Sequence, residues 1–416
     1  MAAAVKLAER GIAVTVFESA KQLGGRARGV IQNHTQLDNG QHILLGCYTQ
    51  TLKLIEQVGG NLDQDFLRLP LQLTLHKHFE LKASNLPAPL HLLVALLSAK
   101  GLKFAERIQA ARFMLTMRQI KFKLQNDLTA LELLRAHRQS EDLIRLMWEP
   151  ICISALNTPV GKASAQVLLN VLRDSLNGSF GDSEILLPRI DFSALFPNRA
   201  AEYVTHHTGK VLTSCAVESI IPQDHVIQLV TAQGAQQFSH VICATSSSNS
   251  ARLLRTVPFL NSTANKIESL NYQPIYTVYL QYPEHVLLSQ AMLGFDRCFT
   301  QWIFDKGQIS AQPGLIAAVI SAEGRHQVLD HDELAKKVAH ELRDQLGITE
   351  EPLWHQVIAE KRATFSCEVN IFRPDNKTPL PNLFLAGDFT AGDYPSTLEG
   401  AVISGVKAAQ EIISSR

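Results

Sequence analysis

Four residues near the start of the chain have the types and the spacing of a nucleotide site. Glu18 ends the apolar run "IAVTVF", and Gly24, Gly25 and Arg26 follow in "LGGRARG". A carboxylate at the end of a buried strand accepts hydrogen bonds from ribose hydroxyls. Paired glycines let a backbone approach a ligand closely, and a guanidinium matches phosphate oxygens. The group favours a pyrophosphate-bearing cofactor, a flavin more than a nicotinamide, over a glycine-rich turn with solvated arginines.

A second group, at the other end of the chain, suits the same kind of ligand. Gly387 and Asp388 follow an apolar run in "NLFLAGDFTAGDYPSTLEGAVISGVKAAQEII". Ligands of parallel α/β sheets bind at the carboxyl ends of strands, where Asp388 is expected to lie. Small side chains let a helix N-terminus approach a planar or anionic ligand. The predicted helix after Asp388 carries several of them, at Gly400, Ala401, Ser404 and Gly405.

The elements that must position Glu18 are a helix and a strand. Residues 2–10 are strong helix formers, and residues 12–17 have the composition of a buried strand. In a Rossmann unit the glycine-rich phosphate loop lies about 20 residues before the acidic residue. Counting back from Glu18 passes Met1, so we expect the first strand and this loop to be absent. Either the start codon is assigned too late, which the intact later motifs favour, or the chain is a natural truncation.

The paired segments "FESAKQLGGRAR" and "LFLAGDFTAGDYPSTLEGAVISG" resemble the flavin amine oxidase and phytoene desaturase superfamily. Within it, "LDNGQHILLGCY", "MWEPICISALNTP" and "GDYPSTLEGAVISG" are similar to the hydroxysqualene dehydroxylases, the squalene-associated FAD-dependent desaturases of hopanoid biosynthesis. The resemblance implies FAD as the cofactor. It also implies an α/β fold, in which a Rossmann-like FAD-binding domain without its first strand and glycine loop is interleaved with an α+β substrate domain.

The resemblance assigns cofactor contacts residue by residue. It places Glu18 at the adenosine ribose, the backbone of Val217 at the adenine, and Ala244 at the tip of a strand that returns to the flavin lobe. The remaining residues that it implies are Gly24, Gly25 and Arg26 at the pyrophosphate, Gly40, Gln41 and His42 beside the isoalloxazine ring, Gly387 and Asp388 at the ribityl and phosphate groups, and Leu398 and Ala401 at the pyrimidine edge.

The reaction that the resemblance implies is the reductive removal of the hydroxyl group of hydroxysqualene, which yields squalene. Such a site must exclude water and needs an acid near the hydroxyl group. His42 and Asp393 are the candidate proton donors, and Tyr394 is a candidate aromatic wall. His42 has an alternative role as a structural histidine, and Asp393 as a turn former. Trp148 and Trp302 either line a hydrocarbon tunnel or pack in the core.

The chain is long enough for two lobes, and they are expected to interleave. We assign residues 1–54, 189–255 and 379–416 to the FAD-binding domain. Residues 55–188, mostly helical after an alternating segment at 71–83, belong to the substrate domain. Residues 256–378 supply its sheet and one helix, at 332–346. A ligand site between the lobes follows from this arrangement.

The composition limits the classes of partner that the protein is expected to bind. The 39 basic and 39 acidic residues balance, so nothing suggests a nucleic-acid partner. The six cysteines are scattered without metal-ligand spacing, which predicts no metal site and fits a reducing cytoplasm. An isoprenoid lipid substrate and a squalene-forming synthase are the partners that the resemblance implies. No signal peptide is evident.

A membrane surface is a further expected partner. An apolar run at residues 90–97 is too short to span a bilayer and is followed by seven basic residues and one acidic residue up to Lys123. Basic charge beside apolar helix faces is typical of peripheral membrane contact, although a buried helix pair with a solvated basic face has the same pattern. We therefore expect a cytoplasmic protein that contacts the inner membrane peripherally through residues 86–123.

Two rival functions remain at this stage. One is a different flavoenzyme of the same superfamily, either a carotenoid-type desaturase or an amine oxidase. The other is a non-catalytic, truncated chain that binds isoprenoid lipid or a partner enzyme.

Overall fold

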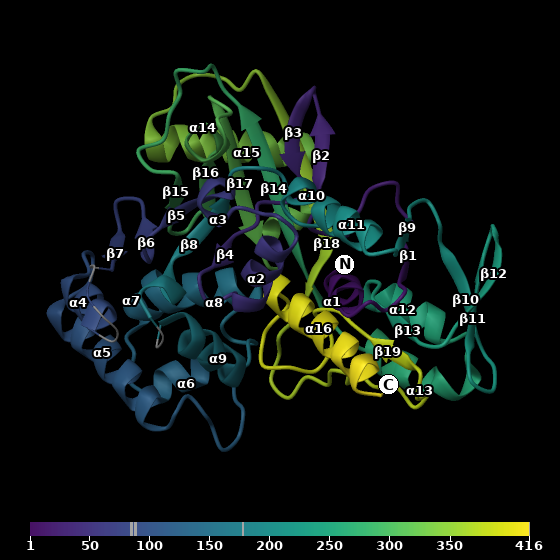
Figure 1. Cartoon of the computed structure of the whole chain (residues 1–416). Helices are drawn as coiled ribbons and strands as arrows, with labels where there is room; N and C mark the ends of the chain where they lie inside the picture. Colours follow the sequence, from purple (N-terminus) through teal and green to yellow (C-terminus); the bar gives the residue numbers. More distant parts are fainter. Residues whose placement is uncertain (84–85, 87–89, 177–178, 416) are drawn as a thin grey trace.

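The computed structural model describes residues 1–83, 86, 90–176 and 179–415, and Figure 1 shows their arrangement. Residues 84–85, 87–89, 177–178 and 416 lie outside the described residues. They belong to the predicted domains, and residues 87–89 also belong to the predicted membrane-contact segment. The architecture is mixed α/β, as predicted, with parallel strands in one part and a large mixed sheet in another. Segments from both ends of the chain meet in the part with parallel strands.

Two parallel strand pairs form the part in which the two ends of the chain meet. β1 (Thr15–Phe17) pairs with β9 (Lys210–Leu212), and β13 (Val241–Cys243) pairs with β19 (Leu383–Leu385). Within the described ranges, no hydrogen-bonded strand joins one pair to the other. The sequence predicts longer strands at both ends of the chain, but ladder hydrogen bonding covers only three residues in each. An antiparallel sheet lies beside these pairs and contains β10 (Val217–Pro222), β11 (Ile227–Thr231) and β12 (Gly234–Phe238).

Helices from distant parts of the sequence pack around these pairs. α1 (Ala2–Glu9) lies against the long helix α16 (Leu398–Ser414), as Figure 1 shows near the N-terminus. A Cβ atom added to Gly405 would lie 3.3 Å from the backbone nitrogen of Ala3, so glycine permits the close approach of the two helices. The other helices of this part are α10 (Phe192–Leu195), α11 (Pro197–His206), α12 (Ser247–Leu254) and α13 (Asn261–Glu268).

A seven-stranded mixed sheet forms the second part. Its strands in spatial order are β18 (Trp354–Phe365), β14 (Tyr272–Gln281), β17 (Leu315–Ser321), β16 (Trp302–Asp305), β15 (Met292–Gly294), β6 (Gln72–Leu75) and β7 (Phe79–Lys82). The alternating segment at residues 71–83 therefore joins strands from the second half of the chain. α15 (His331–Leu346) confirms the predicted helix within one residue, whereas α14 (Lys306–Ser310) was not predicted.

The third part is helical and contains a small sheet. Its α-helices are α3 (Leu62–Asp65), α4 (Leu90–Ser98), α5 (Phe104–Gln119), α6 (Ala130–Ala136), α7 (Glu141–Leu143), α8 (Glu149–Leu156) and α9 (Ala165–Leu176), while α2 (Thr49–Gln57) packs against α16. A π-helical turn at Ile144–Trp148 joins α7 to α8. The sheet contains β4 (Leu44–Leu45), β8 (Ile185–Pro188) and β5 (Phe66–Leu69), while β2 (Gly29–Gln32) and β3 (Thr35–Asp38) form a separate hairpin.

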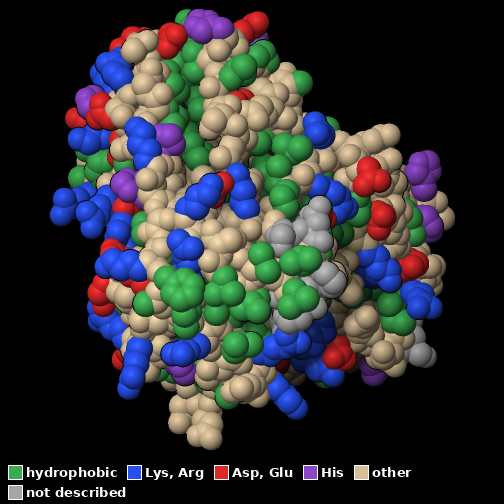
Figure 2. All heavy atoms as spheres, turned by 90° about the vertical axis from the view of Figure 1, so that its left-hand side faces the viewer, with side chains coloured by type: hydrophobic (Ala, Val, Ile, Leu, Met, Phe, Trp, Pro, Cys, Tyr) green, Lys and Arg blue, Asp and Glu red, His purple; other side chains and the backbone are tan. Residues whose placement is uncertain are grey.

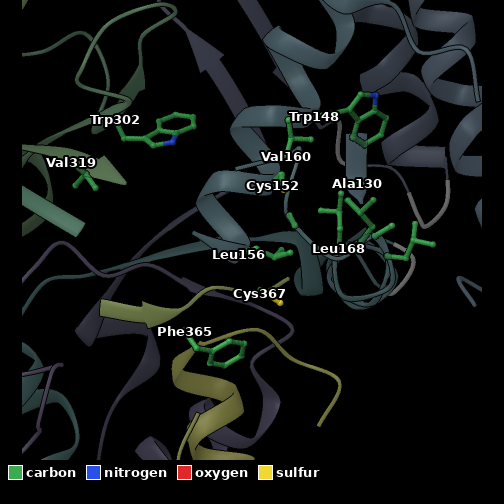
Figure 3. Close-up of a cluster of buried hydrophobic side chains, with 14 of the residues drawn as sticks. Ala130, Trp148, Cys152, Leu156, Val160, Leu168, Trp302, Val319, Phe365 and Cys367 are labelled. Carbon is green, nitrogen blue, oxygen red and sulfur yellow. The ribbon is translucent and has the colours of Figure 1, made fainter. Parts of the chain in front are cut away.

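Packed side chains join the helical part to the large sheet. Figure 3 shows Trp302 of the sheet and Trp148 of the helical part in one buried cluster. The indole nitrogen of Trp302 donates to the Ser154 hydroxyl at 2.9 Å, and that of Trp148 donates to the Gln139 side chain at 2.9 Å. Both tryptophans are thus core residues with satisfied donors, in agreement with the packing alternative.

Asn157 also links these parts and provides a test of the fold. We predict that Asn157→Ala lowers the free energy of unfolding by about 2–4 kcal/mol, because buried polar partners would lose their hydrogen bonds. The buried side-chain amide donates to Thr364 at 2.9 Å and accepts from the Ala322 amide at 2.7 Å. Urea denaturation measures the change, with the exposed Asn126→Ala as the control. Equal midpoints for the two variants would contradict the assigned role.

Candidate functional site

Three of the predicted residues lie just beyond the carboxyl ends of parallel strands. Glu18 follows β1, Ala244 follows β13, and Asp388 lies three residues after β19. The Glu18 backbone oxygen accepts a hydrogen bond from the Cys215 amide at 2.8 Å, which places the segment before Val217 beside it. The edge at which open α/β sheets bind ligands therefore carries the predicted acidic groups.

An ion pair connects the two ends of the chain at this edge. Arg26 Nη2 lies 2.6 Å from Asp388 Oδ1, and the other terminal nitrogen of Arg26 donates to the Ala363 carbonyl of β18. The second Asp388 oxygen accepts from the Ser396 hydroxyl. Because residues 362 positions apart meet here, the fold brings together the two groups that the sequence identified separately.

A cavity of about 240 Å³ opens around this ion pair. It is lined by residues from five separated segments: Arg26, Ser246, Ser247, Ser248, Tyr272, Glu360, Arg362, Phe365, Asp388 and Phe389. The Ser246 hydroxyl accepts from the Asn249 amide and caps helix α12, so the positive end of that helix dipole faces the lining serines. Two guanidinium groups and a capped helix N-terminus are suited to anionic oxygen atoms.

The loop at Gly40, Gln41 and His42 lies next to the ion pair. Asn39, the residue before this loop, donates from its side-chain amide to the Arg26 carbonyl at 3.3 Å. This bond holds the start of the loop against the backbone of Arg26. Gln41 Oε1 and His42 Nδ1 are buried, and neither makes a hydrogen bond to the described residues. Buried polar atoms are almost always paired, so these two atoms indicate a polar ligand at the loop.

The His42 imidazole is neutral at pH 7. Burial lowers its pKa to about 4, with a smaller contribution from the positive charge of Arg26. Its ring centroid lies 4.6 Å from that of Phe192, in the cluster against which Leu398 also packs. His42, Arg26 and Leu398, which the resemblance implies for different edges of the cofactor, thus converge on one region.

Asp38, two residues before Gly40, was not identified from the sequence as a site residue. Its buried carboxylate accepts from the Phe192 amide at 2.9 Å, and burial raises its pKa to about 6. The buried ammonium of Lys306 opposes that shift, and burial in turn lowers the pKa of Lys306. The hydroxyl of Tyr279 donates to the Asp38 carbonyl at 3.0 Å, so β14 supports the start of the loop.

The remaining predicted cofactor residues occupy defined places around the edge. Gly24, Gly25 and Gly387 have positive φ angles of 114°, 60° and 153°, which explains why glycine occupies these turns. Ala401 lies in the first turn of α16, which the Thr397 hydroxyl caps by accepting from the Gly400 amide at 3.1 Å.

Two of the small residues predicted to approach a ligand instead serve contacts within the protein. Gly405 faces α1, and the Ser404 hydroxyl bonds to the Gly387 amide at 3.0 Å and the Asn376 side chain at 2.9 Å. Their small size fixes the position of α16 under the Gly387 turn rather than opening space for a ligand.

The candidate catalytic residues Asp393 and Tyr394 share a loop that is held by two side chains. Arg373 donates to the Tyr394 carbonyl at 2.6 Å, and Asn170 donates to the Asp393 carbonyl at 3.0 Å. The Asp393 side chain is 68% exposed and lies 3.6 Å from Arg173. Burial and the Asp174 carboxylate raise the pKa of the Tyr394 hydroxyl, so Tyr394 keeps its proton at neutral pH.

Sequence reasoning missed the serines at the start of α12 and Arg362 in the middle of a long strand. The run "TSSSNS" after a predicted strand carries the signal of a capped helix N-terminus, and could have been used. Nothing local distinguishes Arg362, which lines the cavity together with Glu360 and Phe365 of β18.

The residues present fit a dinucleotide flavin. Glu18 suits a ribose hydroxyl, Arg26 and the α12 terminus suit phosphate oxygens, and the unpaired atoms of Gln41 and His42 suit a polar ring edge. Among the described residues, no group of histidine, cysteine or acidic side chains is arranged to hold a metal ion.

Comparison with known proteins agrees with this assignment. The family of flavin containing amine oxidoreductases matches residues 1–413. The hydroxysqualene dehydroxylase of Zymomonas mobilis is 26% identical over 432 residues, which cover 100% of this chain and 96% of that protein. The zeta-carotene desaturase of Solanum lycopersicum is 24% identical, with coverage of 99% and 79%.

Solved structures support the fold independently of sequence identity. A triple mutant of putrescine oxidase superposes with a TM-score of 0.75 at 14% identity, covering 100% of this chain and 96% of that one. At this identity the similarity shows the fold alone.

Arg26 provides a test of the cofactor site. We predict that Arg26→Ala weakens FAD binding by roughly tenfold or more, since hydrogen bonds to charged groups are worth about 1.5–3 kcal/mol. Flavin fluorescence quenching during titration measures the dissociation constant. Arg28→Ala is the matched control, because Arg28 lies in the same loop and its side chain donates to the Gly25 carbonyl. Equal losses in both variants would show that the loop charge, not the position of Arg26, matters.

His42 provides a test by pH. Its pKa is lowered from the ordinary 6.5 to about 4, so the unfolded chain binds a proton that the folded chain excludes. The stability that neutral His42 contributes is therefore present above pH 6.5 and is lost as the pH falls toward 4, by up to about 1.4 kcal/mol per pH unit. His42→Gln should flatten this decline in urea unfolding between pH 6.5 and 4. The exposed His225→Gln should leave it unchanged.

Proposed function

The chain belongs to the flavin containing amine oxidoreductase family, and we propose that it removes the hydroxyl group of hydroxysqualene to form squalene, a step of hopanoid biosynthesis. Its cofactor is FAD, and its class is oxidoreductase. The observation that carries the specific proposal is that three relatives named hydroxysqualene dehydroxylase each match 100% of this chain.

The balance of the reaction defines what the chain must do. The substrate loses its hydroxyl group as water after accepting one proton, and the carbon accepts one hydride. FAD, when bound in its reduced form, supplies that hydride. The protein must therefore hold the substrate against the cofactor, deliver the proton to the leaving oxygen and keep water away from the cationic carbon.

We assign the proton to Asp393 rather than to His42. Burial lowers the pKa of His42 to about 4, so its imidazole carries no extra proton at neutral pH. Asp393, the other candidate, is open to solvent, and solvent can supply the proton that it passes on. Tyr394, which stays protonated, can orient the leaving oxygen through a hydrogen bond. His42, paired with Phe192, then contributes position and a dry environment rather than acidity.

Product analysis tests the proposed function. The FAD-loaded protein, reduced under anaerobic conditions, is expected to convert hydroxysqualene to squalene and to oxidise one flavin per product. Zeta-carotene and putrescine are incubated in parallel, because relatives or structural neighbours carry those names. Desaturation of the carotene, or oxidation of the amine, without squalene formation would overturn the proposal in favour of the rival flavoenzyme.

Variants of the proton donor test the assignment within the reaction. Asp393→Asn is expected to lower the rate of the hydride step by about 10²- to 10⁴-fold, the range for general acids, without changing the flavin spectrum. His42→Gln is expected to lower it far less. Stopped-flow absorbance of reduced flavin measures the rate. A larger loss in His42→Gln than in Asp393→Asn would reverse the assignment.

A further inference from the structure

One face of helix α4 presents apolar side chains to solvent. Leu90, Val94 and Leu97 are 50%, 39% and 39% exposed and follow the i, i+4, i+7 spacing that places them on one side of a helix. The opposite side, which includes Leu92 and Leu96, is buried in the main core. The helix is therefore apolar on both sides, and only one side is covered by the protein.

Helix α5 continues this apolar surface. Phe104 at its first residue is 69% exposed, and Leu115 is 52% exposed. Half of the large apolar side chains that are exposed among the described residues lie in this short stretch of the chain: Leu86, Leu90, Val94, Leu97, Phe104, Leu115 and Ile120. Figure 2 shows hydrophobic side chains gathered on the face that carries these helices. Such a gathering marks an interaction surface, whereas single exposed apolar residues do not.

Basic side chains border the apolar surface. Arg112 and Arg118 stand three residues before and after Leu115, so all three share a helix face. Lys100 and Lys103, both exposed, precede Phe104 in the sequence. Figure 2 shows Lys and Arg side chains around the apolar group. The exposed basic residues of this border are Lys100, Lys103, Arg112, Arg118, Lys121 and Lys123.

Among the described residues, Lys100 is the one member of this border that an acidic side chain neutralises. Glu106, which lies within α5, is buried and uses its carboxylate to accept from the Lys103 amide and the Ser140 hydroxyl. Glu80 pairs with Lys100 at 2.7 Å, and Asp142 pairs with Arg145 at 3.0 Å. The surface therefore presents an apolar centre and an excess of positive charge to whatever contacts it.

We propose that the surface formed by α4 and α5 docks onto an anionic phospholipid bilayer. Apolar side chains enter the interface, and the surrounding basic groups lie at the level of the headgroups, where each Lys or Arg strengthens binding about five-fold. No helix of the described residues is long and apolar enough to cross a membrane, so the contact is peripheral. The proposal stands on the surface itself and does not depend on the proposed reaction.

The charge pattern distinguishes a bilayer from other occupants. A second copy of the chain would bring the same positive border to the interface, and like charges would oppose each other. A bilayer with anionic headgroups complements the border at every orientation of the protein about the membrane normal.

Vesicle flotation of the FAD-loaded full chain tests the proposal. Vesicles of phosphatidylcholine alone are compared with vesicles that also contain phosphatidylglycerol, at low and at high salt. The protein is expected to float with the anionic vesicles, and high salt is expected to release it because exposed charges are screened.

Two variants with matched controls locate the contact. Phe104→Ser is expected to lower the partition coefficient by about five-fold or more, since an exposed aromatic ring is lost from the interface. The double variant Arg112→Glu and Arg118→Glu is expected to lower it by roughly 30-fold or more. The controls are Phe259→Ser, at an aromatic side chain that is 58% exposed elsewhere, and the double variant Lys210→Glu and Lys336→Glu.

Each outcome decides the proposal. Loss of flotation in the patch variants, with the controls floating like the parent, supports it. It is overturned if the parent does not float, or if patch and control variants float equally. It is also overturned if sedimentation without lipid shows a dimer that Phe104→Ser dissociates, because the occupant is then a second copy.

Discussion

The close approach of α1 and α16 is the constraint on which the site depends. Gly405 leaves room for the backbone of Ala3, and Ala3 and Leu7 of α1 share one apolar cluster with Ala408 of α16. A larger side chain at Gly405 would push the helices apart. The loops beyond β1 and β19 would then move with them, and Arg26 could no longer reach Asp388. The packing of α1 against α16 is thus a condition for the ion pair between Arg26 and Asp388.

The sequence predicts best where the signal is local. Glu18, the paired glycines and the helix after Asp388 follow from neighbouring residues. Glu18 comes directly after β1, Gly24 and Gly25 have positive φ angles, and α16 begins at Leu398. The seven-stranded sheet was predicted only as a sheet, because its order depends on the pairing of β6 with β15, more than 200 residues later. β8 was missed for the same reason: its partners, β4 and β5, are distant in the sequence.

The candidate site also contains residues that the local sequence predicts and contacts that only the fold reveals. Arg26 and Asp388 were predicted as separate groups, and only the fold shows that they pair. Arg362 of β18 and Ser247 of α12 line one cavity because the fold brings these distant segments together, which no local pattern fixes. The charge state of His42 depends on how completely neighbouring residues shield it, so its sequence context left donor and structural roles open, whereas its burial favours the neutral form.

The packed core connects the surface of α4 and α5 to the cofactor site, which matters for a substrate that is insoluble in water. Trp148 and Trp302, with satisfied indole nitrogens, join the helical part to the sheet whose edge strand β18 lines the cavity. The surface of α4 and α5 lies on the outer side of that same helical part. A close-packed core transmits position but resists deformation. Docking through α4 and α5 would therefore hold the cofactor edge at a fixed height above a bilayer, without requiring a hinge between the docking surface and the site.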